Sequence, residues 1–237
     1  MTVYERQNTI LNFLKQQHFA TIKELSKIVW ASESSIRRDI KTLESKGYLK
    51  QFYGGIVLSG YEKSVVPIAV RNNYNSSVKE ELAKRSAAYF FDGATVFMDG
   101  SSTVRRIIKY INNFRDIKII TNNQLLFNET ISPTIQLYCT GGRFISDNNT
   151  FVGSSAENFL KGINADLLFF SSQAISETGE ISDASEDESS LRKVMLSRAK
   201  KKIFLCDSSK IGLKYAFTVC TKNEIDEIIC DKKLPWE

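Results

Sequence analysis

Ser34 and Arg38 are the side chains whose type and spacing best suit recognition of another molecule. They stand four residues apart, and they fall opposite the apolar stripe of Ile36, Ile40 and Leu43. A guanidinium can bond both acceptors of a guanine edge, and a serine hydroxyl can bond to a base. A solvated face of an ordinary surface helix is the alternative. The flanking segments decide between these two interpretations.

A second set of polar residues follows apolar, strand-like runs farther along the chain. In an open parallel sheet, ligands bind outside the carboxyl ends of the strands. Backbone N–H groups and hydroxyls at a strand-to-helix turn suit a phosphate, and Lys210 adds a positive charge. Helix caps and ordinary loop residues are the alternative for any single turn. The strand ends read Asp99-Gly100-Ser101-Ser102-Thr103, Thr121-Asn122-Asn123, Gly141-Gly142, Ser171-Ser172-Gln173 and Asp207-Ser208-Ser209-Lys210.

The helix that carries Ser34 and Arg38 follows two others. Apolar residues at helical spacing predict a helix over residues 4–17 and a second from Ile22 to Val29, with Thr21 as its cap and Glu24 as the capping-box partner. After the short turn Trp30-Ala31, Ser32 can cap a third helix that runs to about residue 46 and stops at Gly47. This order predicts a helix-turn-helix.

Two β-prone runs, 48–52 and 56–58, flank Gly54-Gly55 and predict a hairpin. A hairpin directly after a recognition helix makes a winged helix. Lys50, Gln51 and Tyr53 can contact a nucleic-acid backbone from this wing, or the wing can simply cover the small core.

The other polar side chains of the third helix have separate predicted roles. Arg37 and Lys41 lie toward its flank and suit phosphates. Asp39 lies near the buried stripe, where its charge predicts a structural ion pair, with a partner that the sequence does not identify.

Helix-like and strand-like stretches alternate from residue 77 onward. The predicted strands are 94–98, 117–120, 135–139, 166–170 and 202–206, and the predicted helices are 79–90, 103–111, 154–161 and 187–200. This alternation predicts an α/β fold with a mainly parallel sheet. Turn residues place a winged helix-turn-helix domain at 1–58, a linker at 59–76 and an α/β domain at 77–237.

Composition narrows the classes further. Residues 1–60 hold nine Lys and Arg against five Asp and Glu, whereas the other 177 residues hold 23 against 22. A basic module on a neutral body is typical of nucleic-acid binding, and narrow apolar stripes argue against a membrane-surface helix. No run approaches a membrane span and no signal peptide is evident, so a cytoplasmic protein is expected. The four cysteines form no CxxC pair, so we expect no bound metal, no other cofactor and no disulfide. A redox role for the cysteines at strand ends stays open.

The first sixty residues resemble the DNA-binding domain of DeoR-type bacterial transcriptional repressors. The resemblance rests on Ala31-Ser32-x-x-Ser35-Ile36-Arg37-Arg38-Asp39-Ile40-x-x-Leu43-Glu44-x-x-Gly47-Tyr48-Leu49, closed by Gly54-Gly55. It implies that Ser35, Arg37 and Arg38 belong to a recognition helix and that the protein binds a double-stranded DNA operator as a homo-oligomer. Family members often have His where Tyr53 stands.

The second part resembles the effector domain of the same repressors, which is similar in fold to ribose-5-phosphate isomerase and senses phosphorylated sugars. The resemblance rests on Asp99-x-x-Ser102-Thr103, Thr121-Asn122, Gly141-Gly142, Glu188 before Leu191-Arg192-Lys193, and Asp207-Ser208-Ser209-Lys210. It implies that Gly100, Ser101, Ser102 and Thr103 hold a phosphate and that Asp99, Asn122 and Lys210 hold a sugar, with Thr121 and Gly141 in adjoining turns.

Ser101 and the run Ser171-Ser172-Gln173-Ala174 depart from the family pattern, in which glycines are common at these places. Added side chains take up space, so the site binds a different metabolite or has narrowed. The leading hypothesis is a repressor modulated by a phosphorylated sugar. An isomerase-like enzyme and a DNA-binding repressor with a degenerate sensor are the alternatives.

Overall fold

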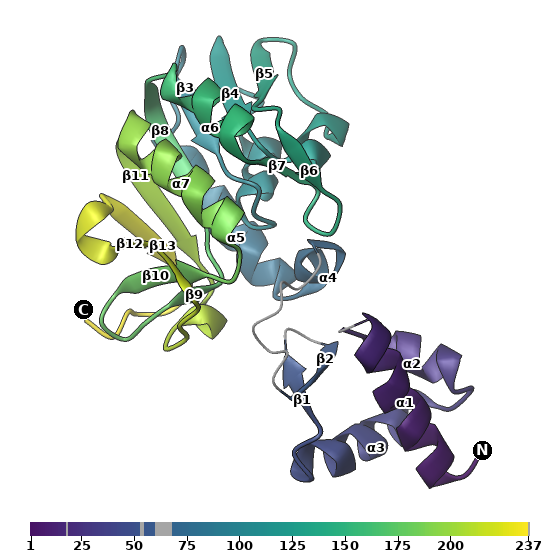
Figure 1. Ribbon diagram of the computed structural model, residues 1–237. Coiled ribbons are helices and arrows are strands. Elements are labelled where there is room, and N and C mark those ends of the chain that lie inside the picture. The colour runs from purple at the N-terminus through teal and green to yellow at the C-terminus, as the bar shows by residue number, and fades with distance from the viewer. Residues whose placement is uncertain (18, 53–54, 60–67, 237) are drawn as a thin grey trace. The chain divides into compact units, whose positions relative to one another are not determined.

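The chain forms two compact units, Met1–Tyr74 and Asn75–Glu237 (Figure 1). The computed structural model describes residues 1–17, 19–52, 55–59 and 68–236. Within these ranges, no helix has both the length and the hydropathy that crossing a bilayer requires.

The first unit begins with three helices, as the sequence predicts: α1 (Val3–Gln17), α2 (Ile22–Ile28) and α3 (Glu33–Ser45). The capping box of Thr21 and Glu24 begins α2, and the Ser32 hydroxyl accepts from the Ser35 N–H to begin α3. Gly47 adopts a φ of +77°, the left-handed conformation that ends a helix. The three helices bury a shared core that includes Ile10, Leu14, Leu25, Ile36, Ile40 and Leu43.

A two-stranded antiparallel hairpin, β1 (Leu49–Phe52) and β2 (Gly55–Leu58), follows α3. Leu49 and Ile56 add to the helical core. Gly55 packs against Phe19 so closely that a Cβ atom there would lie 1.9 Å from the ring. The predicted wing is therefore present, and close backbone packing explains the glycine that begins its second strand. Gly54, the other predicted turn residue, lies outside the described residues.

The second unit is built around a six-stranded parallel sheet with the strand order β13-β11-β8-β3-β4-β5. This confirms the predicted α/β fold class. The strands are β3 (Thr95–Met98), β4 (Ile117–Thr121), β5 (Ile135–Cys139), β8 (Ala165–Phe170), β11 (Ala199–Cys206) and β13 (Glu227–Cys230).

Side chains alternate across the sheet and feed two separate cores. Leu167 and Phe169 of β8 join the core beneath α5 (Ser76–Ser86), whereas Leu168 and Phe170 join the core beneath α6 (Ser154–Lys161) and α7 (Glu186–Arg198). Figure 1 shows α6 and α7 together on one face of the sheet. Helices on both faces explain why these strands read as continuous apolar runs.

Several local features differ from the sequence-based prediction. Val104–Tyr110 is a 3₁₀ helix instead of an α-helix, and α5 ends at Ser86 before the short 3₁₀ segment Ala87–Tyr89. A short helix, α4 (Ile68–Asn73), lies within the stretch expected as a linker. The sequence also did not reveal short antiparallel strands, which lack a long apolar run. They are β6 (Arg143–Ile145), β7 (Thr150–Val152), β9 (Ala174–Ile175), β10 (Glu180–Asp183) and β12 (Phe217–Thr221).

Candidate nucleic-acid interface and ligand site

The outward face of α3 carries serine, arginine and lysine. Ser34, Arg37, Arg38 and Lys41 are exposed, and Ser35 is half-buried. Arg38 Nε donates to the Ser34 carbonyl oxygen at 3.4 Å and Nη2 to Ser35 Oγ at 3.5 Å, while Arg37 lies 3.8 Å from Glu33. These contacts are long, so they hold the guanidinium groups only weakly. Both arginines can rearrange toward a partner at little cost.

Asp39, the acidic residue in the middle of α3, is withdrawn from the surface. It is 3% exposed, and its carboxylate accepts from Arg6 Nε, from Arg6 Nη2 at 3.1 Å and from Gln7 Nε2 at 3.2 Å. The hydrogen bond from Arg6 to Asp39 raises the pKa of Arg6. The predicted structural ion pair is confirmed, and its partner is on α1. The pair removes a negative charge that would repel DNA.

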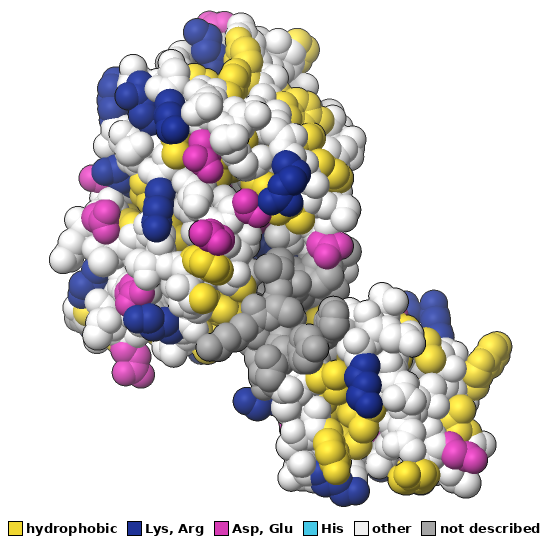
Figure 2. All heavy atoms as spheres, in the orientation of Figure 1, with side chains coloured by type: hydrophobic (Ala, Val, Ile, Leu, Met, Phe, Trp, Pro, Cys, Tyr) yellow, Lys and Arg dark blue, Asp and Glu magenta, His cyan; other side chains and the backbone are white. Residues whose placement is uncertain are grey.

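Glu44 fixes the wing against α3. Its carboxylate accepts from the Gln51 backbone N–H at 3.0 Å and from Gln51 Nε2 at 3.1 Å. These bonds, first of all the one from the backbone, lower the pKa of Glu44. The wing residue Lys50 is exposed, and Tyr53 lies outside the described residues. Charged side chains on the visible face of the first unit are mainly Lys and Arg, whereas the second unit shows both signs interspersed (Figure 2).

The predicted ligand residues lie at the carboxyl ends of neighbouring strands. The order β11-β8-β3-β4-β5 places the turns after these strands in one row. In this row Asp99, Ser101, Ser102, Thr103, Thr121, Asn122, Ser171 and Lys210 are buried, and Gly141 is half-buried. The sheet therefore gathers side chains that the sequence spreads over more than a hundred positions.

The turn after β3 is ordered from both sides. Asp99 accepts from the Ser101 N–H at 3.1 Å and from the Ser171 N–H at 3.3 Å. Lys79 of α5, buried at 3% exposure, donates to Ser102 Oγ at 3.3 Å. Among the described residues, Thr103 Oγ1 has no hydrogen-bond partner.

Asn122 follows β4 and lies beside Gly100 in the turn after β3. Its Nδ2 donates to the Phe151 carbonyl at 3.2 Å, and its buried Oδ1 has no hydrogen-bond partner within the described ranges. Gly100 packs beside it, because a Cβ atom there would lie 2.2 Å from Thr150 Cγ2 and 3.3 Å from Asn122 Nδ2. Buried polar atoms are normally satisfied, so the two without partners mark a place suited to water or a polar ligand.

The turns after β8 and β11 are joined by Lys210. Its Nζ donates to Ser171 Oγ at 2.8 Å and lies 3.5 Å from Asp207 Oδ2. Burial raises the pKa of Asp207, but the Lys210 ammonium, together with bonds from Ser209 and Asn75, outweighs burial and leaves that pKa below its ordinary value. Asp207 is therefore an anion at neutral pH.

The serine hydroxyls that depart from the family pattern are bonded within the protein. Ser171 Oγ donates to the Leu205 carbonyl at 2.6 Å, and Ser172 Oγ donates to the Ser182 carbonyl at 2.6 Å. Ser101 Oγ accepts from the Val104 N–H at 3.2 Å. These side chains therefore brace the turns themselves.

Arg192 is the centre of a buried ion cluster behind the ligand turns. It is 4% exposed and bonds to Asp99 at 2.8 Å, Asp183 at 2.9 Å and Glu188 at 3.3 Å. Glu188 also accepts from Thr150 Oγ1 at 3.0 Å. Burial opposes the charged form, but the three carboxylates outweigh it and raise the pKa of Arg192. The cluster thus ties α7 to the turn after β3.

The row is longer than one small molecule. Lys210 and Gly141 follow strands that are four positions apart in the sheet, about 19 Å at a spacing of ~4.8 Å. Gly141 has a φ of +64°, which a glycine adopts without strain. The left-handed backbone at position 141 is therefore a sufficient reason for a glycine there, and contact with a ligand is not needed to explain it.

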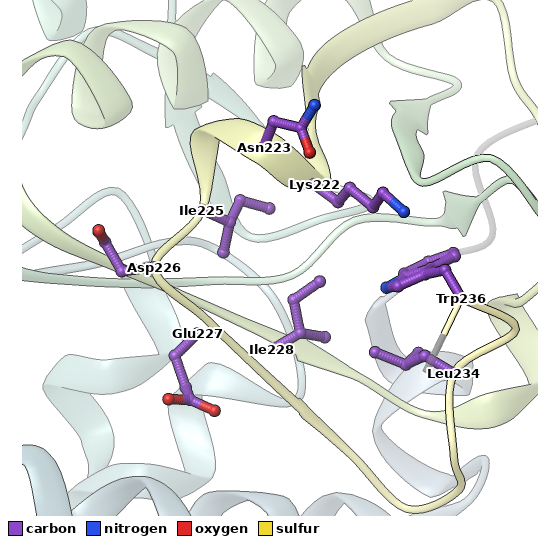
Figure 3. Close-up of a pocket in the computed structure, with 8 residues that line it drawn as sticks. All are labelled: Lys222, Asn223, Ile225, Asp226, Glu227, Ile228, Leu234 and Trp236. Carbon is purple, nitrogen blue, oxygen red and sulfur yellow. The ribbon is translucent and has the colours of Figure 1, made fainter.

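A separate cavity of about 240 Å³ lies near the amino end of β13 (Figure 3). Lys222 Nζ sits 4.6 Å from the ring centroid of Trp236 beside it. Its lining contains none of the predicted site residues: Lys222, Asn223, Ile225, Asp226, Glu227, Ile228, Leu234 and Trp236. Because it lies at the opposite ends of the strands, it is distinct from the ligand turns.

Sequence reasoning missed Lys79 and the partner of Asp39. Lys79 precedes the buried residues Leu82 and Ala83 by three and four positions, so it shares their face of α5. A lysine on an apolar stripe was the available signal. No comparable signal identifies Arg6, which is 33 residues from Asp39 in the chain.

Two protein-family models match the chain. One describes a DeoR-like helix-turn-helix domain and matches residues 6–60. The other describes a DeoR C-terminal sensor domain and matches residues 74–232. Together they account for most of both units.

Similar proteins include several bacterial regulators. The HTH-type transcriptional regulator GolR of Listeria innocua is 31% identical over 235 residues, covering 99% of this chain and 92% of that protein. The HTH-type transcriptional repressor GlcR of Bacillus subtilis is 29% identical over 229 residues, covering 96% and 88%.

The chain is also similar to solved structures at low sequence identity. The structure of eIF2B beta from Chaetomium thermophilum matches with a TM-score of 0.51 and 12% identity, covering 97% of this chain and 85% of that one. A D-ribose-5-phosphate isomerase in complex with phospho-erythronic acid has a TM-score of 0.43 and 16% identity, covering 57% and 54%.

Proposed function

This chain belongs to the DeoR family of transcriptional regulators, and from that premise we propose that α3 reads a double-stranded DNA operator and that a phosphorylated sugar changes its affinity. Ser34 and Arg38 contact base edges, with Arg38 bidentate to a guanine. Ser35, Arg37, Lys41, Lys50 and Tyr53 contact the backbone from α3 and the wing.

One observation carries the DNA-binding proposal. The acidic side chain of Asp39 is neutralised inside the unit by Arg6, while every basic residue of α3 stays exposed. The helix thus withdraws the acidic group in its middle while it presents arginine, lysine and serine together, and its exposed Glu33 is ion-paired with Arg37 at 3.8 Å, so the remaining exposed charge suits phosphates. The two hydrogen bonds of Glu44 with Gln51 support joint docking of helix and wing.

The DNA-binding proposal is tested with an operator selected from random duplexes by the full chain. Arg38→Ala should cost about 1–3 kcal/mol of specific affinity and relax the preference for one guanine. Lys15→Ala is the matched control, because it removes one exposed positive charge from α1. Equal losses in the two variants, measured by fluorescence anisotropy, would reject base readout by Arg38.

The sensor proposal places a phosphate against Ser101, Ser102 and Thr103. The buried Lys79 ammonium on Ser102 supports an anion there, and the unsatisfied Thr103 Oγ1 supports a hydrogen-bonding ligand. The sugar lies toward Asp99, Gly100, Asn122 and Lys210, with Thr121 and Gly141 shaping the neighbouring turns. Because Lys210 and Gly141 follow strands about 19 Å apart in the sheet, the proposal assigns the sugar contact to Lys210 and leaves Gly141 to shape its turn.

Selective binding of a ligand to the folded state raises its melting temperature, so a panel of sugar phosphates tests the sensor directly. Unphosphorylated sugars and inorganic phosphate are the matched controls. A shift in melting temperature together with a change in operator affinity supports the sensor proposal. A shift together with turnover supports the isomerase-like alternative, and no shift supports the degenerate sensor.

A regulator is favoured over an enzyme by the state of the acidic residues. Asp99, Asp183 and Glu188 all direct their carboxylates at Arg192, so in this geometry they stabilise the fold behind the ligand turns. Helix-turn-helix proteins commonly read two half-sites as dimers, so we also propose a homo-oligomer on the operator. A footprint on a single half-site would contradict that arrangement.

A further inference from the structure

Trp30 is held in an unfavourable conformation and leaves its side chain in solvent. It lies in the turn between α2 and α3 with a φ of +51°, a region that side-chain-bearing residues rarely adopt. Its side chain is 94% exposed, more than any other large hydrophobic residue described. Glycine would remove both penalties, so packing within this unit does not account for an indole here.

The turn itself explains the backbone of Trp30. The Ala31 N–H donates to the Ser26 carbonyl at 3.0 Å, and the Val29 N–H donates to the Leu25 carbonyl at 3.0 Å. The bond from Ala31 to Ser26 is typical of a helix end at which the residue before the donor, here Trp30, is left-handed. Glycine is usual at that position, and asparagine is tolerated. The helix-turn-helix geometry therefore sets the φ angle of position 30, whichever residue occupies it.

The position of this turn indicates what the indole meets. Trp30 precedes Ser32, the cap of α3, by two residues, and Ser34 by four. The amino-terminal end of a recognition helix is the end that enters the major groove. Exposed Lys27 in the last turn of α2 and exposed Arg37 flank the turn along the chain. From Lys27 to Arg38 the chain carries three exposed basic side chains, Lys27, Arg37 and Arg38, against one exposed acidic side chain, Glu33, which is ion-paired with Arg37 at 3.8 Å. This net positive charge fits a polyanionic partner better than an apolar one.

We propose that Trp30 packs against the sugar-phosphate backbone at the edge of the major groove, beside the bases read by Ser34 and Arg38. This inference rests on the proposed operator binding by α3. The ring covers deoxyribose, and its Nε1–H donates to a phosphate oxygen. Because backbone contacts carry no base identity, Trp30 adds affinity for duplexes in general and leaves the base preference to α3.

Fluorescence isolates this residue, because the chain contains only two tryptophans and the other is Trp236. In a full-length Trp236→Phe chain, saturation with the selected operator should change Trp30 emission and reduce its quenching by iodide. An unrelated duplex at low salt should produce the same change. Unchanged emission and quenching at saturation would overturn the proposal.

Binding assays supply the second readout. Trp30→Gly and Trp30→Asn both suit the left-handed backbone and should weaken operator and unrelated duplex by the same factor, roughly tenfold. Neither removes a charge, so the dependence of affinity on salt should keep its slope, whereas Arg37→Ala should reduce that slope by about 1. Circular dichroism should show both Trp30 variants folded.

The outcomes separate this inference from the proposed function. Wild-type affinity in both Trp30 variants, with Arg38→Ala still impaired, overturns the role of Trp30 alone. Failure of the wild-type chain to bind any duplex overturns both. Emission that changes with protein concentration in the absence of DNA assigns Trp30 to a contact between copies and also overturns the proposal.

Discussion

Replacing Arg192 by Met should destabilise the second unit more than any substitution on the exposed side of α7. Arg192 bonds at 2.8–3.3 Å to Asp99, Asp183 and Glu188, whose side chains are 1–4% exposed. Met fills part of the space but leaves three buried carboxylates without their shared cation. Removing one partner of a buried ion pair costs about 3–5 kcal/mol of unfolding free energy.

The pH dependence of the variant follows from the same charges. In the wild type the carboxylates raise the pKa of Arg192, against the effect of burial, so the arginine stays charged at all ordinary pH values. In Arg192→Met the crowded carboxylates bind protons more readily when folded than when unfolded. Stability then rises as pH falls, because the folded state binds more protons. The deficit should therefore be smaller at pH 5 than at pH 7.

Urea unfolding followed by Trp236 emission measures this loss, in a Trp30→Gly background that leaves one tryptophan. Lys193→Met is the matched control, because it removes an exposed cation from the same helix. We expect a change within about 0.5 kcal/mol for the control. A loss below about 1 kcal/mol in Arg192→Met, or a deficit that grows toward pH 5, would refute the assignment of Arg192 as the charge-balancing centre.

Three further substitutions or measurements test the packing of both units. Gly100→Ala should cost roughly 1–3 kcal/mol in thermal unfolding, and Thr150→Ser should recover most of that loss, because the clash is with Thr150 Cγ2 at 2.2 Å; no recovery would contradict this cause. Asp39→Asn should lower the unfolding free energy of the first unit by about 1–3 kcal/mol in urea denaturation, since its half-buried partner Arg6 loses an anion; an unchanged midpoint would argue against the ion pair. Burial raises the pKa of Cys220 to about 12, so its alkylation at pH 8, followed by mass spectrometry, should be roughly tenfold slower than that of half-buried Cys139; equal rates would contradict the burial.

The first unit was predictable because its determinants are local. Capping at Thr21 and Ser32 and the apolar stripe of α3 act within one or two helical turns. Even the withdrawal of Asp39 followed from its place beside that stripe. Its partner did not, because Arg6 reaches it from another helix, across 33 residues of sequence.

The second unit also has features that the sequence predicted and features that it did not. Alternating elements and polar residues after apolar runs were enough to predict a parallel α/β sheet and the turns that would carry a ligand. They did not reveal the strand order, the short antiparallel strands or the 3₁₀ character of Val104–Tyr110.

By itself, the sequence determined where the helices and turns of this regulator lie and which side of each helix is apolar, since these features depend on neighbours a few positions apart. Tertiary structure alone decided which charged groups meet: Arg192 bonds to carboxylates from the turn after β3, from β10 and from α7, and Lys79 bonds to the turn after β3. It also decided that Lys210 and Gly141 follow strands that are four positions apart in the sheet. The physical reason is that pairing between distant segments is set by strand order and by packing across the sheet, which periodicity in one segment cannot specify.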